Sequence, residues 1–156
     1  MFCRQGLIRM VLALLVSSAP GLAGAHDHEH SHDAGAPGKL ELKQGAKWPT
    51  DAHLRQGMDG IRHAMREKVA ELRSGAFKLE QAHTLSQKVN EQIAFMVQNC
   101  KMDSDADAVF HLVLADIIAG ADALAGQDMG KAQQGAEKIS HALENYGIYF
   151  DHPGWH

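Results

Sequence analysis

The residues of this chain best suited to chemistry form a histidine-rich run, residues 26–33, with the sequence HDHEHSHD. Four of the eleven histidines of the chain alternate with other residues in it: His26, His28, His30 and His32. Imidazole and carboxylate groups at alternate positions of a flexible chain can surround a divalent transition-metal ion, because none of them has to leave a folded core. The run therefore predicts metal binding.

The residues before this run have the three parts of a secretory signal peptide. Arg4 and Arg9 supply positive charge, residues 7–16 are otherwise apolar, and residues 23–25 (Ala-Gly-Ala) match a small-residue cleavage signature. The apolar stretch is far shorter than the roughly 20 residues that a membrane span needs. We therefore expect residues 1–25 to be removed and the mature protein to be exported to a bacterial periplasm, with no membrane association afterwards. A retained N-terminal anchor is the alternative.

Cleavage after Ala25 would make His-Asp-His the new N-terminus, with His28 at the third position. A free amine, two backbone amide nitrogens and the imidazole of His28 can then form a four-nitrogen square plane, the geometry that Cu(II) and Ni(II) prefer. A cut elsewhere would leave a general histidine cluster suited to Zn(II), Ni(II) or Cu(II). A solvated leader that binds no physiological metal is the plain alternative.

Charge and cysteine content narrow the classes of function. The full chain has a formal net charge of −4 and no clustered basic patch, which argues against nucleic acid as a partner. Cys3 would leave with the signal peptide, so Cys100 is the single cysteine of the mature chain and no intramolecular disulfide can form. A lone thiol in an oxidising compartment is either buried, paired with a second copy, or a soft metal ligand. We therefore expect a monomer or a Cys100-linked dimer.

The rest of the chain is organised as a leader followed by helices. Residues 26–47 are polar and rich in glycine and alanine, which predicts a disordered leader. From Thr50 onward the apolar residues recur at helical spacing. The pattern predicts an all-α protein, an up-down-up-down antiparallel four-helix bundle over residues 48–156. Its helices are expected at about 51–74, 79–101, 104–125 and 128–150, with Thr50 or Asp51 capping the first and Asp103 or Ser104 capping the third.

Helical phasing places three histidines away from the core. His63, His111 and His141 each stand two residues from a core position of the same helix, about 200 degrees round the axis. We expect all three to be solvated surface side chains. None of them then supplies an inward-facing ligand within the bundle.

The chain resembles small periplasmic four-helix cytochromes of the cytochrome b562 and cytochrome c′ type in size, export signal and helix layout. Met58, early in the first helix and followed at core spacing by Ile61 and Met65, is similar to the axial methionine of the b562 pattern. The resemblance implies haem b as a cofactor, with Met58 as one ligand. The last helix lacks an inward histidine where the second ligand would stand, and no Cys-x-x-Cys-His motif is present for covalent attachment.

The antiparallel arrangement would gather soft ligands at one end of the bundle. Met96 and Cys100 are four residues apart on one helix, and Met102 follows as that helix ends. Thiolate and thioether sulfur select Cu(I), although both residues are equally suited to packing in the core. The same end receives an aromatic tail and three histidines that could also reach a metal: His53, His152 and His156.

These patterns lead to three hypotheses of function, none of them catalytic, because the chain carries no nucleophile elbow, phosphate-binding loop or His-Glu-x-x-His motif. The first is an exported transition-metal-binding protein, copper favoured over nickel or zinc, that holds the ion or hands it on. The second is a b-type haem electron carrier. The third is a metal-independent module that contacts a periplasmic protein through its aromatic end.

Overall fold

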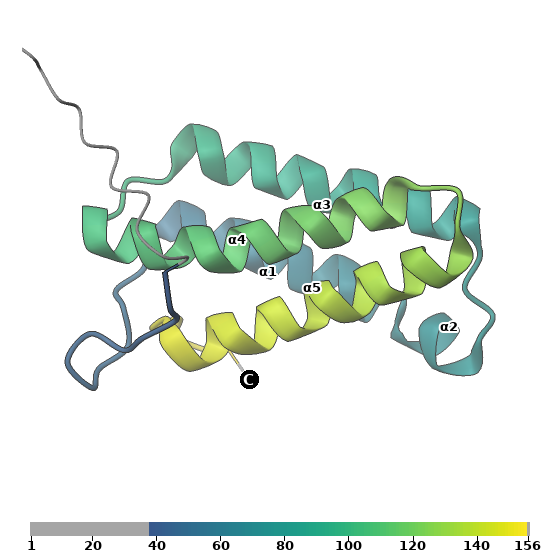
Figure 1. Cartoon of the computed structure of the whole chain (residues 1–156). Coiled ribbons are helices and arrows are strands. Elements are labelled where there is room, and N and C mark those ends of the chain that lie inside the picture. The colour runs from purple at the N-terminus through teal and green to yellow at the C-terminus, as the bar shows by residue number, and fades with distance from the viewer. Residues whose placement is uncertain (1–37, 156) are drawn as a thin grey trace, which may run out of the picture. The chain divides into compact units, whose positions relative to one another are not determined.

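A computed structural model describes residues 38–155 of the chain, and these residues are mostly helical. Within this range no strand is formed, and two isolated β-bridges link Lys43 to Ala46 and Trp48 to Phe150. The all-α prediction is confirmed. Four long helices lie side by side, with one short helix between the first two of them (Figure 1). The helices are α1 (Ala52–Arg66), α2 (Val69–Ser74), α3 (Leu79–Asn99), α4 (Ser104–Ala125) and α5 (Met129–Tyr149).

Aspartate side chains cap three of the long helices, and the sequence predicts Asp51 and Asp103 among the capping residues. The Asp51 carboxylate accepts a hydrogen bond from the Leu54 amide at 2.6 Å, at the start of α1. Asp103 caps α4 and Asp128 caps α5 in the same way. Each cap satisfies an amide at a helix start that has no partner within the helix.

The first helix is shorter than predicted, and the expectation of one helix over 51–74 is wrong. α1 ends at Arg66, the chain turns at Glu67 and Lys68, and the six residues of α2 follow. Between Met65 and Leu72 the chain has only Val69 and Ala70 as apolar side chains, and neither of them is buried. No residue of α2 is fully buried. Helices in proteins depend on such burial more than on their intrinsic propensity, which explains the break.

The closest helix contact joins α4 and α5 through two glycines. A Cβ atom on Gly135 would lie 2.6 Å from the carbonyl oxygen of Gly120, and a Cβ on Gly120 would lie 2.5 Å from Cγ1 of Ile139. Both distances are shorter than real side chains allow. The two backbones therefore touch because neither position carries a side chain.

The other helix pairs meet through particular side chains. At the start of α3, the buried Ser86 hydroxyl donates to the Ala121 carbonyl, late in α4, at 2.8 Å. At the other end, Met96 of α3 packs on Gly57 of α1. The end of α3 therefore lies against the start of α1, and its beginning lies against the end of α4.

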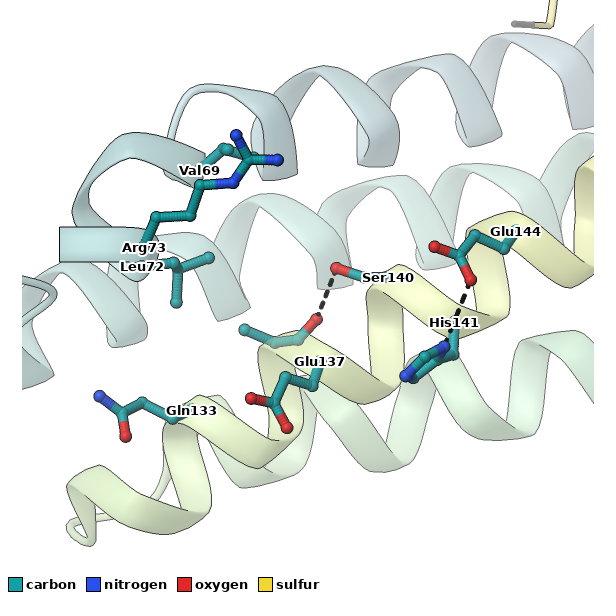
Figure 2. Close-up of a pocket in the computed structure, with 9 residues that line it drawn as sticks. Val69, Leu72, Arg73, Gln133, Glu137, Ser140, His141 and Glu144 are labelled. Atoms are coloured by element: carbon teal, nitrogen blue, oxygen red, sulfur yellow. Dashed lines mark hydrogen bonds and ion pairs between the residues drawn. The ribbon is translucent and has the colours of Figure 1, made fainter. Parts of the chain in front are cut away.

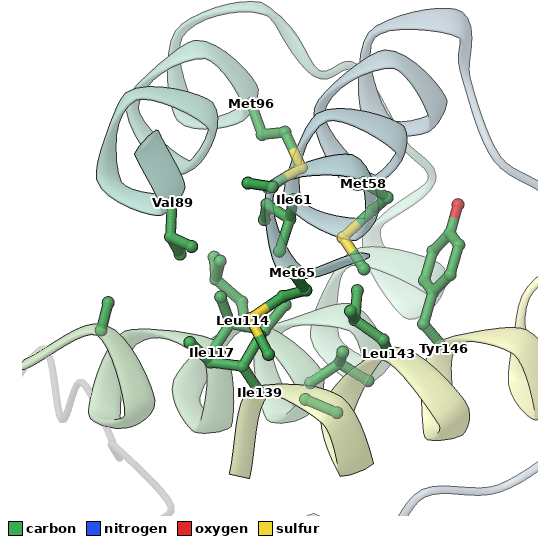
Figure 3. Close-up of a cluster of buried hydrophobic side chains, with 14 of the residues drawn as sticks. Met58, Ile61, Met65, Val89, Met96, Leu114, Ile117, Ile139, Leu143 and Tyr146 are labelled. Carbon is green, nitrogen blue, oxygen red and sulfur yellow. The ribbon is translucent and has the colours of Figure 1, made fainter. Parts of the chain in front are cut away.

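The core lies between the long helices and is continuous (Figure 3). The apolar face predicted for the last helix is buried at every position: Ala132, Ala136, Ile139, Leu143, Tyr146 and Phe150. α4 alone among the described helices is long and apolar enough, by length and composition, to cross a membrane. In this structure it packs against both α3 and α5.

The segment before α1 lies against the helices. Leu40 packs against the core, and the Trp48 indole N–H donates to the Glu41 carbonyl at 2.6 Å. The Trp48 amide donates to the Tyr149 carbonyl, and its own carbonyl accepts from the Asp151 amide, both at 2.8 Å. Of the leader expected to be disordered over residues 26–47, residues 26–37 lie outside the described residues. In the remaining part, Leu40 packs against the core and Glu41 accepts from Trp48, because Leu40 has apolar surface to bury.

Candidate metal-binding end of the helices

The predicted ligands fall into two groups with respect to the structure. His26, His28, His30, His32 and His156 lie outside the described residues 38–155. Met58, Met96, Cys100, Met102, His53 and His152 lie within them. Of these, Met96, Cys100 and Met102 lie where α3 finishes and α4 begins.

The Met96 side chain belongs to the contact between α1 and α3. It is 1% exposed, and a Cβ on Gly57 would lie 2.2 Å from its Cγ and 2.6 Å from its Sδ. The thioether thus occupies the space that Gly57 leaves open. Figure 3 shows Met96 directed toward α1, among buried apolar side chains. In this arrangement its sulfur packs in the core.

Cys100 ends α3 and lines a pocket of about 260 Å³ between the end of α3 and the first turns of α4. Met96, Val97, Phe110 and Leu114 form the apolar part of the pocket, and Asp107 and His111 form its polar part. Burial raises the pKa of the Cys100 thiol to about 11, with a further contribution from the carboxylates of Asp51 and Asp107. The thiol is therefore protonated at neutral pH, and a metal ion would have to displace its proton in order to bind.

His111 shares this pocket, and the sequence did not predict it as a ligand. Its Nδ1 lies 2.8 Å from the backbone oxygen of Asp107, one turn earlier, and 3.5 Å from the Asp107 carboxylate. Both partners are acceptors, so Nδ1 carries the hydrogen and the lone pair lies on Nε2. Metal-binding histidines are commonly fixed in this way. The prediction that His111 is solvated is confirmed, yet exposure to water did not exclude it from the pocket.

Met102 and His53 belong to the same end but do not join this pocket. Met102 is half-buried and packs against the core. His53 is exposed, and its ring meets Phe95 edge-on at 5.8 Å between centroids. Asp51 holds this end together, since its second carboxylate oxygen accepts from the Lys101 amide at 2.5 Å. His63 and His141 are exposed, as predicted.

His152 is buried, and hydrogen-bonding partners occupy both of its ring nitrogens. Nδ1 lies 3.0 Å from the Tyr146 hydroxyl, and Nε2 lies 3.3 Å from a carboxylate oxygen of Asp59. Sequence phasing missed this cluster, because Asp59 lies on α1 and His152 follows α5. With both nitrogens engaged, His152 has no free lone pair for a metal ion in this arrangement.

Met58, the ligand expected for haem, is fully buried in α1. Figure 3 places its thioether among apolar side chains of the core, with Leu143 and Tyr146 of α5 nearby. His141 is the only histidine of α5, and its side chain is exposed. The buried His152 lies just beyond the end of that helix.

A larger pocket, of about 560 Å³, opens between α2 and α5 (Figure 2). Leu72 and Arg73 of α2 face Glu137 and His141 of α5 across it, and His141 pairs with Glu144 at 3.3 Å. No sulfur side chain lines this pocket. It therefore offers a metal ion no sulfur ligand, unlike the pocket at Cys100.

As the side chains are placed, no three His, Cys, Asp or Glu residues within 38–155 form a group that could hold a metal ion. Comparison of the chain with protein-family models, with curated proteins and with solved structures gives no match.

Proposed function

We propose that the mature chain is an exported, non-catalytic protein that binds a transition-metal ion in the periplasm and holds it or hands it on. Copper is the favoured ion, with nickel and zinc as alternatives. The observation that carries this proposal is the run of four alternating histidines directly behind a signal-peptide cleavage signature. It places His28 third in the mature chain, where Cu(II) or Ni(II) can take four nitrogen ligands.

The pocket at Cys100 supports a second binding site on the folded part. A thiol, a carboxylate and an imidazole line it, from Cys100, Asp107 and His111. These groups are the usual donors to Zn(II), and copper also accepts thiolate and imidazole. The Met96 thioether is committed to the α1–α3 contact, so His111 is the better partner for Cys100. This pocket would bind its ion less readily than the leader, because the Cys100 proton must first leave.

The arrangement of helices that we propose for this function is the up-down-up-down antiparallel bundle of α1, α3, α4 and α5. Three contacts support it: Gly57 with Met96, Ser86 with Ala121, and Gly120 with Gly135. Each joins an early part of one helix to a late part of its neighbour. In such a bundle the Cys100 pocket lies at the end where α1 starts and α5 finishes.

Calorimetry with Cu(II) on the mature chain tests the metal proposal. We expect one tight phase of about one ion per chain, which is lost when residues 26–33 are deleted. Cys100→Ser should remove a weaker phase and leave the tight phase unchanged. His141→Ala, an exposed histidine outside both sites, is the matched control and should alter neither phase. Unchanged tight binding after the deletion would refute the proposal.

A b-type haem electron carrier is the second candidate, favoured by the buried thioether of Met58. Haem added to the mature chain should then give a Soret band that Met58→Ala abolishes, and absence of the band would rule this candidate out. A chain that binds neither metal nor haem would leave the metal-independent interaction module, which contacts a protein partner through its aromatic end.

A further inference from the structure

The last described residues, His152–Trp155, form a short strap at the end of α5. Pro153 and Gly154 turn the chain, Gly154 with a φ of +80° that favours glycine, and the Trp155 amide donates to the His152 carbonyl at 3.1 Å. The preceding residue, Asp151, is held to Trp48 and Thr50 by backbone and hydroxyl hydrogen bonds. The strap itself is held mainly by two side chains, those of His152 and Trp155.

The His152 side chain joins α5 to α1. Asp59 of α1 can only accept a hydrogen bond while it is ionised, so the ring nitrogen that faces it, Nε2, carries the hydrogen. Nδ1 then holds the lone pair, and the Tyr146 hydroxyl of α5 donates to it at 3.0 Å. The closed strap therefore requires a neutral His152 with its hydrogen on Nε2.

The Trp155 ring makes the second link between the same two helices. It lies under the Arg62 guanidinium of α1 at 4.1 Å and meets the Tyr146 ring of α5 at 4.7 Å between centroids. A Cβ on Gly147 would lie 2.8 Å from its Cδ1 and Nε1, so the indole rests directly on the α5 backbone. α1 and α5 touch each other at few points, and the strap fills the seam between them.

A second proton on His152 would disturb this arrangement. It would place a cation on a side chain that is 4% exposed, and it would remove the lone pair on Nδ1 that accepts from the Tyr146 hydroxyl, so that the hydroxyl would have to turn and accept instead. The charged groups around the ring are Asp59, Arg62 and Arg55, all on α1, and the titratable Tyr146 faces it from α5. Asp59 favours the imidazolium, whereas burial and the two arginines oppose it.

Burial is the largest of these effects and lowers the pKa of His152 below its usual 6.5. A histidine whose pKa is lowered in the closed form stabilises that form fully above about pH 6.5, and the stabilisation is lost as the pH falls through the lowered pKa. Acid therefore favours opening. The direction follows from the burial of the ring, which outweighs the attraction of Asp59, and does not depend on a bound metal.

We propose that the strap His152–Trp155 is a pH-sensitive latch, closed across α1 and α5 at neutral pH and released when His152 takes a second proton. Release would uncover the Tyr146 side of the α1–α5 seam. An exported protein meets the pH of its surroundings directly, which gives such a latch a signal to respond to. This inference is independent of the metal proposal.

Proton–nitrogen NMR of the mature chain tests the latch through the indole N–H resonances of its two tryptophans. Between pH 7.5 and 4.5 the Trp155 resonance should shift with a midpoint below 6.5, while the Trp48 resonance and the helical circular dichroism stay constant. Asp59→Asn should move the midpoint to lower pH, because the carboxylate that favours the imidazolium is lost. His141→Gln, which changes an exposed histidine outside the proposed metal sites, should leave the midpoint where it is.

In His152→Gln the pH-dependent shift should disappear, with the Trp155 resonance fixed at either its neutral or its acid position. A Trp155 shift that persists in this variant would overturn the latch. So would a resonance that does not move over the pH range, or one that moves only together with Trp48 as the helices unfold. An Asp59→Asn midpoint that rises would contradict the assignment of His152 as the titrating group.

Discussion

The contact between Gly120 and Gly135 gives a sharp test of the packing. Gly135→Ala adds one methyl group where α5 crosses α4. Its carbon would lie 2.6 Å from the Gly120 carbonyl oxygen and 2.8 Å from the Ala123 Cβ, against ordinary contacts of 3.4 Å or more. The nearest atom belongs to the backbone, so no side-chain rotation relieves the overlap. The two helices must separate locally by several tenths of an ångström.

Two opposing effects set the size of the loss. Alanine is favoured over glycine within a helix by about 1 kcal/mol. Overpacking a close-packed core costs about 1–3 kcal/mol, and more where the backbone has to move. We expect the second effect to win, with the free energy of unfolding lowered by about 2 kcal/mol. For a chain of this length that corresponds to a fall in Tm of about 6–10 °C.

Urea and thermal unfolding followed by circular dichroism would measure this loss. Gly130→Ala is the matched control, since it lies in the first turn of the same helix and its Cβ would meet only the Asp128 carboxylate, at 3.3 Å. That variant should be neutral, or more stable by up to about 1 kcal/mol. If Gly135→Ala proved as stable as Gly130→Ala, the close crossing of α4 and α5 would be wrong.

Two further predictions concern the end of the helices that carries Cys100. Asp51→Ala removes the acceptor of both the Leu54 and Lys101 amides and should lower the free energy of unfolding by about 1–2 kcal/mol at pH 7, measured in urea. Burial would raise the pKa of Asp51, but its backbone hydrogen bonds outweigh burial and lower the pKa. The loss in free energy of unfolding relative to the parent chain should therefore shrink as the pH falls below about 4 and the carboxylate takes up a proton. A loss that stays constant with pH would contradict the cap. The pKa of Cys100 is raised to about 11, so at pH 7.5 iodoacetamide should alkylate the thiol about two orders of magnitude more slowly in the folded chain than in the urea-unfolded chain. Equal alkylation rates would show that the thiol is not held as described.

Sequence periodicity was sufficient to predict most of the helical architecture. The six apolar positions predicted for the last helix, five in α5 and Phe150 directly after it, are all buried because a strict alternation of three- and four-residue steps leaves one helix face for the core. The caps at Asp51 and Asp103 were also predictable, since each is a short acidic residue directly before an apolar repeat. The break at Glu67 and Lys68 was not predicted, because no proline or glycine marks it.

The candidate sites were harder to predict because they depend on residues from different elements. Phasing of α4 correctly placed His111 in water, but it could not show that the end of α3 brings Cys100 to the same pocket. In the same way, no periodicity links His152 to Asp59, which are held together only when the strap folds back onto α1. The signal that was present is the unusual set of tyrosine, phenylalanine, histidine and tryptophan residues over the last turn of α5 and the residues after it.

The bridge between Trp48 and Phe150 also has a consequence for the order of folding. Its hydrogen bonds close a loop of about a hundred residues, and closing such a loop from an unfolded chain costs about 4 kcal/mol in entropy. A few hydrogen bonds, at about 1 kcal/mol each, do not offset that cost unless α1 and α5 already hold the two segments near each other. The pairing should therefore form late, so that protection of Trp48 from solvent reports a chain whose helices have all assembled.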